Sequence, residues 1–286
     1  MSNKLPITAI VLTYNEEVNL SHCLSNLKPH VDEIIVVDSY SEDKTVEIAE
    51  EYTDKVVQHE FENQAQQFNW ALESQDIKNE WIFWIDADEW VTEDLWKELY
   101  KKLPQTSEEV TGFYMKRRVY FLNRWIKHGG YYPTWILRLF RKNKAKSENR
   151  EVDEHVKLLE GRAQRLENDF VDQNRKGIKA WIDKHNDYST REARERIKMQ
   201  KQENDPDLGD QPEKKRKMKR LYNNLPLFFR SFLYFIYRYI FRLGFLDGKE
   251  GLIFHFLQGF WHQFTIDAKI YEQKKVSEQS SNENNK

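Results

Sequence analysis

The chain contains 286 residues, of which 39% are hydrophobic and 14% aromatic, so it can bury the core of one sizeable α/β domain with an appendage. Its only cysteine, Cys23, excludes an internal disulfide and fits a reducing compartment. A net charge of −2 gives no reason to expect a nucleic-acid partner, and Lys4-Leu5-Pro6 runs directly into the first predicted strand without a signal peptide.

Residues 7–111 alternate between apolar runs and helical spacing, which is typical of an α/β sheet. The predicted strands are 7–12, 34–37, 56–57 and 81–85, and the predicted helices are 20–27, one from 46, 63–72 and one from 92. Ligands bind at the carboxyl ends of strands in such sheets, so the polar loops there describe a crevice. Taken singly, each loop could also be ordinary helix capping.

Glycine is absent from this part of the chain before Gly112. The dinucleotide fingerprint and the Walker phosphate loop both need glycines directly after a strand. A nucleotide bound here must therefore be held by side chains and a metal ion. Residues 1–100 also carry 22 acidic against 6 basic side chains, a surplus that would repel a phosphate-rich ligand without an intervening cation.

The predicted strand Trp81–Ile85 runs into the acidic segment Asp86-Ala87-Asp88-Glu89. If the chain stayed extended, both aspartates would point into the crevice, and paired carboxylates beside a diphosphate suit Mg²⁺ or Mn²⁺. The alternative is that Asp88 and Glu89, with Glu93 and Asp94, lie in the first turn of the next helix, where the helix dipole favours negative charge.

Four segments carry a specific combination of residues. They are Leu12-Thr13-Tyr14-Asn15-Glu16, Val37-Asp38-Ser39 with Ser41, Asp43 and Thr45, Asn69-Trp70-Ala71-Leu72, and Asp86-Ala87-Asp88. In this order and spacing they resemble the inverting family 2 glycosyltransferases of the GT-A fold, over about residues 5–160. The resemblance implies an α/β fold with a Rossmann-like mixed sheet flanked by helices, and a nucleotide-sugar donor that we expect to be UDP-linked.

The resemblance also implies roles for single residues. Tyr14, Asn15 and Glu16 would flank the nucleobase and ribose, Asp38 would hydrogen-bond the base, Asp86 would lie against the ribose and diphosphate, and Asp88 would bind the metal. The other donor-binding candidates are Thr13, Ser39, Gln67, Ala87 and Arg138. Many relatives carry Lys or Arg where this chain has Phe68, which leaves the diphosphate contacts there open.

Two downstream segments, Tyr132–Arg141 and Glu151–Val156, resemble the acceptor side of bacterial surface-glycan transferases. Relatives that resemble lipopolysaccharide-core glucosyltransferases usually have Val-His-Glu, and here Asp153 takes the His position and Glu154 keeps the Glu. An inverting transfer needs a base for the acceptor hydroxyl, and Glu154 is the candidate. It could also be an exposed acid in a charged loop, and His155 a metal ligand or a structural histidine.

Beyond residue 100 the charge balance reverses to 39 basic against 25 acidic side chains, which favours an anionic partner. Six cations within 214–220 precede an aromatic run, 225–242, that Arg230 and Arg238 interrupt, so the run is too short to span a bilayer. We expect this helix, its arginines gathered on one side, to lie in the interface of an anionic membrane, with a second amphipathic helix over 252–271. The alternative is packing on the catalytic domain or on a second copy.

These observations predict a catalytic domain over 1–165, a helical extension and linker over 166–211, basic membrane-associating helices over 212–275 and a disordered tail over 276–286. We expect a metal-dependent glycosyltransferase on the cytoplasmic face of the inner membrane, acting on a lipid-linked or lipopolysaccharide-type glycan. The alternatives are a catalytically silent nucleotide-sugar binder or scaffold at the membrane, and a sugar nucleotidyltransferase, whose usual Gly-rich N-terminal loop is absent.

Replacing the candidate base should separate catalysis from donor binding. Glu154→Gln should preserve donor binding and lower the transfer rate by about 10² or more, because a positioned general base contributes about that much. Transfer kinetics and donor titration measure the two effects. If Asp153→Asn abolishes transfer while Glu154→Gln keeps near-normal kcat, the base is Asp153. Loss of donor binding in both variants would mean that this loop shapes the donor site.

Overall fold

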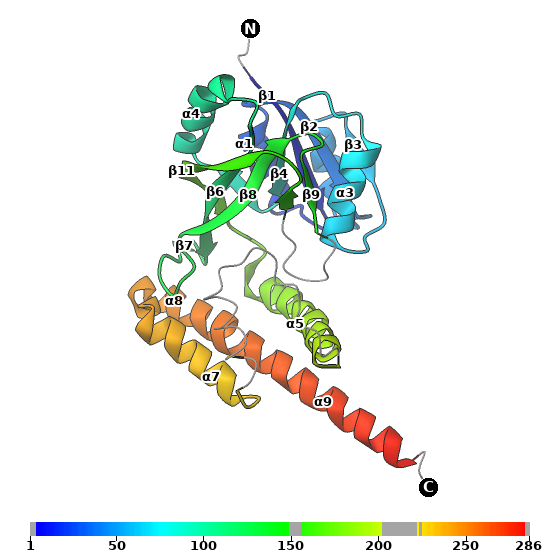
Figure 1. The fold of residues 1–286 in the computed structure, drawn as a ribbon, viewed down its shortest axis with the longest axis vertical. Coiled ribbons are helices and arrows are strands. Elements are labelled where there is room, and N and C mark those ends of the chain that lie inside the picture. Colours follow the sequence, from blue (N-terminus) through cyan, green and yellow to red (C-terminus); the bar gives the residue numbers. More distant parts are fainter. Residues whose placement is uncertain (1–3, 149–155, 202–221, 223–224, 284–286) are drawn as a thin grey trace. The chain divides into compact units, whose positions relative to one another are not determined.

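The computed structural model describes residues 4–148, 156–201, 222 and 225–283. The chain divides into two compact units, Met1–Lys127 with Tyr131–Gly177, and His128–Gly130 with Ile178–Lys286. We name them the sheet unit and the helical unit. The elements of the sheet unit (Figure 1) are β1 (Leu5–Thr13), α1 (Leu20–Leu27), β2 (Val31–Asp38), α2 (Thr45–Glu50), β3 (Val56–Gln58), α3 (Gln64–Ser74), β4 (Trp81–Asp86), β5 (Glu89–Val91), α4 (Glu93–Lys102), η1 (Leu103–Gln105), β6 (Val110–Phe121), β7 (Arg124–Trp125), β8 (Thr134–Arg141), β9 (Ala145–Ser147), β10 (Val156–Leu158) and β11 (Arg162–Asp172).

Within the described residues, nine strands of the sheet unit form one mixed sheet in the order β3-β2-β1-β4-β8-β6-β11-β5, with β7 paired to β6. β1 lies between β2 and β4 and is parallel to both, whereas β8 is antiparallel to β4 and β6. The register aligns Thr13 with Asp38 and Leu12 with Asp86, so the carboxyl ends of three neighbouring strands are level. The mixed α/β sheet predicted from the sequence is confirmed.

Helices cover both faces of this sheet, as Figure 1 shows for α3 and α4 on opposite sides. Successive side chains of a strand point to opposite faces, so Ala9 and Val11 pack with the leucines of α1 while Ile10 packs with Phe68 of α3. These strands are buried on both faces, which explains why they read as continuous apolar runs in the sequence.

The acidic segment after β4 does not stay extended. Ala87 and Asp88 form a turn, Ala87 is buried, and β5 begins at Glu89, which pairs with Asp172 of β11. The extended geometry expected for Asp86 and Asp88 is therefore wrong, because a strand pairing that the local sequence does not reveal turns the chain between them. Their side chains have different partners as a result.

The next helix has the acids that the helix dipole favours. Thr92 is the N-cap of α4 and its hydroxyl accepts a hydrogen bond from the backbone N–H of Leu95 at 3.3 Å. Glu93 and Asp94 follow in the first turn, as the alternative interpretation predicted for them. That interpretation does not hold for Asp88 and Glu89, which precede the helix.

β11 extends the sheet beyond the predicted domain boundary at residue 165. Leu166 and Phe170 are buried in the core, so residues 166–172 are strand and not the expected start of a helical extension. Charged residues between these apolar positions hide the strand pattern. Residues 202–211, the end of the predicted extension and linker over 166–211, lie outside the described residues.

The helical unit has its own small core. Its elements are α5 (Gly177–Lys201), α7 (Phe229–Ile236), the π-helical η2 (Tyr237–Phe241), the 3₁₀ segment η3 (Gly244–Asp247), α8 (Gly248–His255), the π-helical η4 (Phe256–Trp261) and α9 (His262–Glu283). Ala193 of α5 packs with Ile266 and Ile270 of α9. α9 includes residues 276–283, so the disordered tail predicted over 276–286 is wrong for these residues.

The arginines of the aromatic helix point into the helical unit. Arg230 is 2% exposed and its Nε donates to the two carboxylate oxygens of the fully buried Asp267 at 2.8 and 3.1 Å. The Nε of Arg238, also buried, donates to the carbonyl oxygen of Gly129 at 2.8 Å. The side of the helix that carries Arg230 and Arg238 therefore faces the inside of the unit, and the contact of its aromatic side with a membrane stays a prediction. The six cations of 214–220 lie outside the described residues, within which no helix is long and apolar enough to cross a membrane.

Removing Arg230 should destabilise the helical unit strongly. Arg230→Ala leaves the carboxylate of Asp267 buried and uncompensated, so we expect a loss of about 3–5 kcal/mol in the free energy of unfolding, whereas Arg242→Ala, at an exposed position, should change it by less than about 0.5 kcal/mol. Urea unfolding measures both. The double variant Arg230→Met with Asp267→Leu should recover most of the loss. If Arg230→Ala and Arg242→Ala lower the free energy of unfolding equally, Arg230 does not form a buried ion pair with Asp267.

Candidate functional site

The loops after β1 and β2 are joined at the carboxyl edge of the sheet. Asp38 is fully buried, and its carboxylate accepts hydrogen bonds from the hydroxyl of Thr13 at 3.1 Å and the backbone N–H of Ser41 at 2.9 Å. The side chain of Gln58 donates to the same carboxylate at 3.1 Å. Asp38 therefore joins the end of β1 to the loop after β2. A direct hydrogen bond from a nucleobase to Asp38 stays a prediction.

Hydrogen bonds fix the loop after β1 to the loop after β2. Asn15 adopts a left-handed φ of 53°, its N–H donates to Ser41 Oγ, and its Oδ1 accepts from the N–H of Glu42, both at 2.8 Å. Tyr14 is left 56% exposed, as expected for a residue that flanks a base. Tyr40 is equally exposed and also has a positive φ. No motif singles out Tyr40, and only the loop conformation reveals it.

A buried cation holds the end of β4. Arg138 Nη2 donates to Asp86 Oδ2 at 2.7 Å and to Glu89 Oε1 at 2.6 Å, while Gln64 and Trp84 donate to Asp86 Oδ1 at 3.1 and 3.2 Å. Burial lowers the pKa of Arg138, but the carboxylates of Asp86 and Glu89 together outweigh burial and raise this pKa. Burial raises the pKa of Glu89, and the charge of Arg138 opposes that rise. No motif marks Glu89 as a site residue in the sequence.

Asp88 lies on the other side of the turn, close to Glu16. Its Oδ2 accepts from the side chain of Asn174 at 3.1 Å, and Glu16 contacts Lys176 at 2.5 Å and Asn19 at 2.8 Å. Burial, followed by the negative charge of Asp88, raises the pKa of Glu16. Asn174 and Lys176 follow β11, more than 80 residues from the motif, so no local sequence signal marks them.

The donor set of this crevice fits a divalent cation bound together with a diphosphate. In the part of the chain that the structure describes, no three His, Cys, Asp or Glu side chains converge into a complete metal-binding set. Mg²⁺ in phosphate sites is held by one or two carboxylates, the substrate phosphates and waters, so the half-buried Asp88 suffices as a protein ligand. The adjacent charge of Glu16 adds negative potential that a cation would offset.

Gln67 and Phe68 have separate environments on α3. Gln67 is buried and its Nε2 donates to Ser39 Oγ and to the carbonyl oxygen of His59, each at 3.1 Å. Phe68 is fully buried and stacks on Trp84, with ring centroids 4.0 Å apart. The position where many relatives carry a cation therefore belongs to the core in this chain, and Gln67 is the α3 side chain that supports the loop after β2.

The predicted base lies outside the described residues, as do Asp153 and His155. The strands on either side of that segment are described: β9 and β10 pair with Ser147 opposite Val156. Asn69 anchors β9, because its side chain accepts from the N–H of Ser147 at 3.0 Å and donates to its carbonyl oxygen at 2.9 Å. The Asn of the third motif segment thus positions β9, the strand that precedes the segment of the candidate base in the sequence.

Cationic and aromatic side chains share one face of β6, β8 and β11. The register places Lys116 opposite Trp135 and beside Asp169, and Arg165 beside Tyr114. Lys116 Nζ and Arg165 Cζ lie 5.8 and 4.9 Å from the centre of the Trp135 ring. Burial favours a lower pKa of Lys116, but the charge of Asp169 favours a higher one, and the pKa of Lys116 is raised. We name Tyr114, Lys116, Trp135 and Arg165 the aromatic-cationic face.

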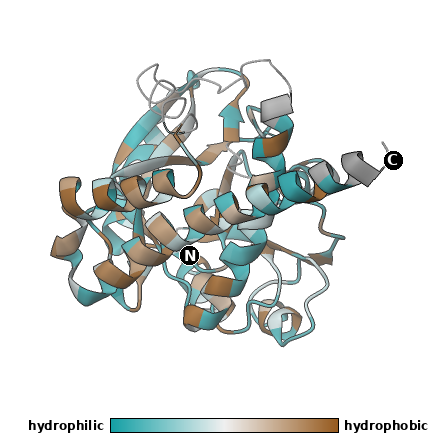
Figure 2. Ribbon diagram, turned by 90° about the horizontal axis from the view of Figure 1, so that it is seen from below, coloured by the Kyte–Doolittle hydropathy of each residue, from teal (hydrophilic) through white to brown (hydrophobic). Residues whose placement is uncertain are grey.

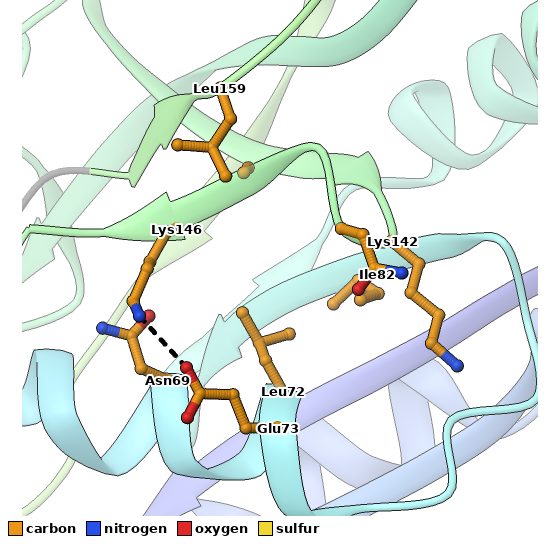
Figure 3. A pocket seen from close by; sticks show the side chains of 9 residues that line it. Asn69, Leu72, Glu73, Ile82, Lys142, Lys146 and Leu159 are labelled. Carbon is orange, nitrogen blue, oxygen red and sulfur yellow. Dashed lines mark hydrogen bonds and ion pairs between the residues drawn. The ribbon is translucent and has the colours of Figure 1, made fainter.

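A hollow of about 210 Å³ lies between α3 and the β8–β9 turn. Figure 3 shows Lys146 and Glu73, whose side chains form an ion pair of 3.0 Å, on one side of it, and Lys142 on another. None of the donor-binding candidates lines this hollow, and Lys142 Nζ donates to the carbonyl oxygen of Ile77. We assign it no part in donor binding.

Comparison with known proteins decides the family. Residues 8–158, more than half of the chain, match the model of Glycosyl transferase family 2. The chain belongs to glycosyltransferase family 2. The resemblance drawn from the four motif segments is confirmed, and with it the GT-A-type fold class.

Individual relatives cover parts of this family 2 chain. The lipopolysaccharide core biosynthesis glycosyltransferase LpsC of Rhizobium meliloti is 33% identical over 156 residues, which are 51% of this chain and 54% of LpsC. An uncharacterized glycosyltransferase of Rickettsia bellii is 40% identical over 93 residues, 32% of this chain and 31% of that protein. The chain therefore spans about half the length of LpsC and less of the second relative.

Solved structures show more distant similarity. S. aureus TarS 1-349 has a TM-score of 0.44 and 15% identity, covering 94% of this chain and 92% of TarS. Glucosyl-3-phosphoglycerate synthase from Mycobacterium tuberculosis, in complex with Mg²⁺ and UDP, has a TM-score of 0.33 and 22% identity, covering 40% of this chain and 43% of that one. These similarities are too low to assign a ligand to this chain.

Replacing the candidate metal ligand should leave the fold intact and remove metal-dependent donor binding and turnover. Asp88→Ala deletes a half-buried carboxylate whose Oδ2 accepts a hydrogen bond from Asn174, so its thermal stability should stay near that of the parent. Donor titration with and without Mn²⁺ measures the binding. The control is Glu93→Ala, which removes an exposed acid at the start of α4 and should change neither property. Transfer by Asp88→Ala at the parent rate under saturating Mg²⁺ would refute the assignment.

Proposed function

We propose that this family 2 chain transfers a sugar, with inversion, from a UDP-linked donor to a lipid-linked or lipopolysaccharide-type glycan, using Mg²⁺ or Mn²⁺, at the cytoplasmic face of the inner membrane. The observation that carries the proposal is that Asp88 and Glu16 both contact the segment 174–176 beside the level ends of β1, β2 and β4, where no glycine loop can bind phosphate. The match to LpsC supports the choice of acceptor class.

Different residues at this edge of the sheet would contact different parts of the donor. Tyr14 and Tyr40 are the exposed aromatic side chains of the two loops and suit contact with a base and ribose. Asp86 is oriented by Arg138, which also fixes the turn that carries Asp88. When bound, a divalent cation would neutralise the charge that develops on the departing diphosphate.

The transfer step needs one proton acceptor. Glu154 would take the proton of the acceptor hydroxyl as that oxygen bonds to the anomeric carbon and the bond from this carbon to the nucleoside diphosphate breaks. The nucleoside diphosphate leaves with the bonding electrons, and the configuration at the anomeric carbon inverts. Asn69 anchors β9, the strand that precedes the Glu154 segment in the sequence.

A nucleotide-sugar screen tests the proposal against its alternatives. A bound donor should stabilise the chain thermally only when Mn²⁺ is present, by about 2.7 kcal/mol at a concentration of 100 Kd, and EDTA should reverse the effect. Stabilisation without donor hydrolysis or transfer would favour the silent binder. Pyrophosphate release from a nucleoside triphosphate and a sugar phosphate would favour the nucleotidyltransferase. If no nucleotide sugar stabilises the chain, the proposal fails.

The aromatic-cationic face supports an anionic glycan acceptor, and Trp135 tests it. A flat indole flanked by Lys116 and Arg165 suits a sugar ring that carries phosphate or carboxylate groups. Trp135→Ala should raise KM for the acceptor about tenfold, equivalent to about 1.4 kcal/mol, and leave the rate of donor hydrolysis unchanged. Trp135→Phe, which keeps a flat ring, should stay near the parent. An unchanged acceptor KM in Trp135→Ala would place the acceptor elsewhere.

A further inference from the structure

The outer surface of the helical unit is apolar to an unusual degree. Of the 23 large hydrophobic side chains exposed within the described residues, 12 lie between Phe229 and Phe256. These side chains belong to α7, η2, η3, α8 and η4 and to the connection between η2 and η3. Figure 2 shows the hydrophobic colour along much of the helical ribbon. Phe241, at the end of η2, is 73% exposed. We name this surface the hairpin face, and its most prominent members are Phe229, Phe232, Tyr237, Ile240, Phe241 and Phe245.

The polar side chains of the same helices point the other way. Asp267 receives hydrogen bonds from Arg230, from Ser231 Oγ at 3.1 Å and from the N–H of Phe228 at 2.8 Å. Arg238 is held by Gly129 and by the hydroxyl of Tyr234 at 2.8 Å. Burying an arginine is costly unless it is paired, whereas exposing phenylalanine to water forfeits its burial energy. This distribution is the reverse of that on a helix whose outer side faces water.

The connection between the helices is fixed by contacts inside the unit. Asp247 of η3 is buried and its carboxylate accepts from the N–H and pairs with the ring of His128, at 2.9 and 2.6 Å. Gly244 allows close packing, because a Cβ there would lie 2.6 Å from the ring of His255. The exposed side chains of the hairpin face are thus presented by a backbone with defined anchors, and their exposure is a property of the folded unit.

We propose that the hairpin face inserts into the interfacial zone of an anionic lipid bilayer. Together α7 and η2 span about 20 Å at ~1.5 Å per residue, less than the ~30 Å of a bilayer core, so the helices lie in the surface and do not cross it. Arg242 and Lys249, which are exposed at this surface, meet the anionic headgroups. A two-fold dimer through the same face would instead bring these like charges of both copies together.

This inference deepens the proposed function, because a membrane-bound face brings the enzyme to a lipid-linked acceptor. It is tested with vesicles alone, without donor or acceptor, and so does not depend on catalysis. The full chain should float with vesicles of equal parts phosphatidylcholine and phosphatidylglycerol, and much less with phosphatidylcholine alone. Phe232→Ser with Phe241→Ser should weaken this binding about tenfold or more, whereas Leu159→Ser, an exposed apolar site of the sheet unit, should not change it.

A site-specific probe guards against variants that bind poorly because they misfold. Cys23 is buried, and burial raises the pKa of its thiol, so an introduced cysteine can be labelled selectively with an environment-sensitive dye. A dye on Phe241→Cys should shift to the blue with anionic vesicles, and one on Lys274→Cys, exposed on α9, should not. Equal shifts at both positions would refute insertion by the hairpin face.

The remaining outcomes separate this inference from the proposed function. A chain that ignores anionic vesicles at low salt and runs as a dimer that the Phe232→Ser, Phe241→Ser variant dissociates would overturn the membrane proposal in favour of a second copy. Vesicle binding by a chain that never hydrolyses a nucleotide sugar would sustain the inference and refute the proposed function. A doubly substituted chain that keeps donor hydrolysis in solution but no longer floats would support both.

Discussion

The site depends on the cation of Arg138, which joins the end of β4 to the start of β5. The buried carboxylate of Glu89 and the partly buried carboxylate of Asp86 would repel each other and lose hydration, and the guanidinium within 2.7 Å of each offsets both costs. Because the same ion pairing closes the turn at Ala87 and Asp88, Asp88 is held at the crevice while Asp86 is occupied by protein partners. A single arginine from an antiparallel strand thus separates two aspartates that look equivalent in the sequence.

The helical unit uses the same chemistry for another purpose. Arg230 and Asp267 form a pair that is almost completely buried, and their hydrogen bonds fix which side of α7 faces inward. In each unit the ion pair fixes the positions of neighbouring residues more than it adds net stability, since desolvation offsets much of the attraction. In the sheet unit it orients the candidate metal ligand, and in the helical unit it leaves an aromatic surface outside.

The proposed function draws on three separate parts of the chain. The level strand ends and the two joined loops would bind the donor through side chains and a cation, because no glycine loop is available. The aromatic-cationic face would contact an anionic acceptor, and the hairpin face would contact the membrane that carries it. Asn69 fixes β9, which pairs with β10.

The sequence alone was sufficient for the positions of the first four strands and for the family, because buried parallel strands are apolar runs and their end loops carry the motif residues. It could not determine the strand nature of residues 166–172, whose pattern is hidden by charges, or the roles of Asn174, Lys176 and Glu89, which reach the site only through non-local pairing. It also could not decide which side of the aromatic helix faces inward. Helical periodicity reveals that Arg230 and Arg238 lie on one side, but only the tertiary structure, which supplies Asp267 and the carbonyl oxygen of Gly129 as partners, decides that this side is the inside.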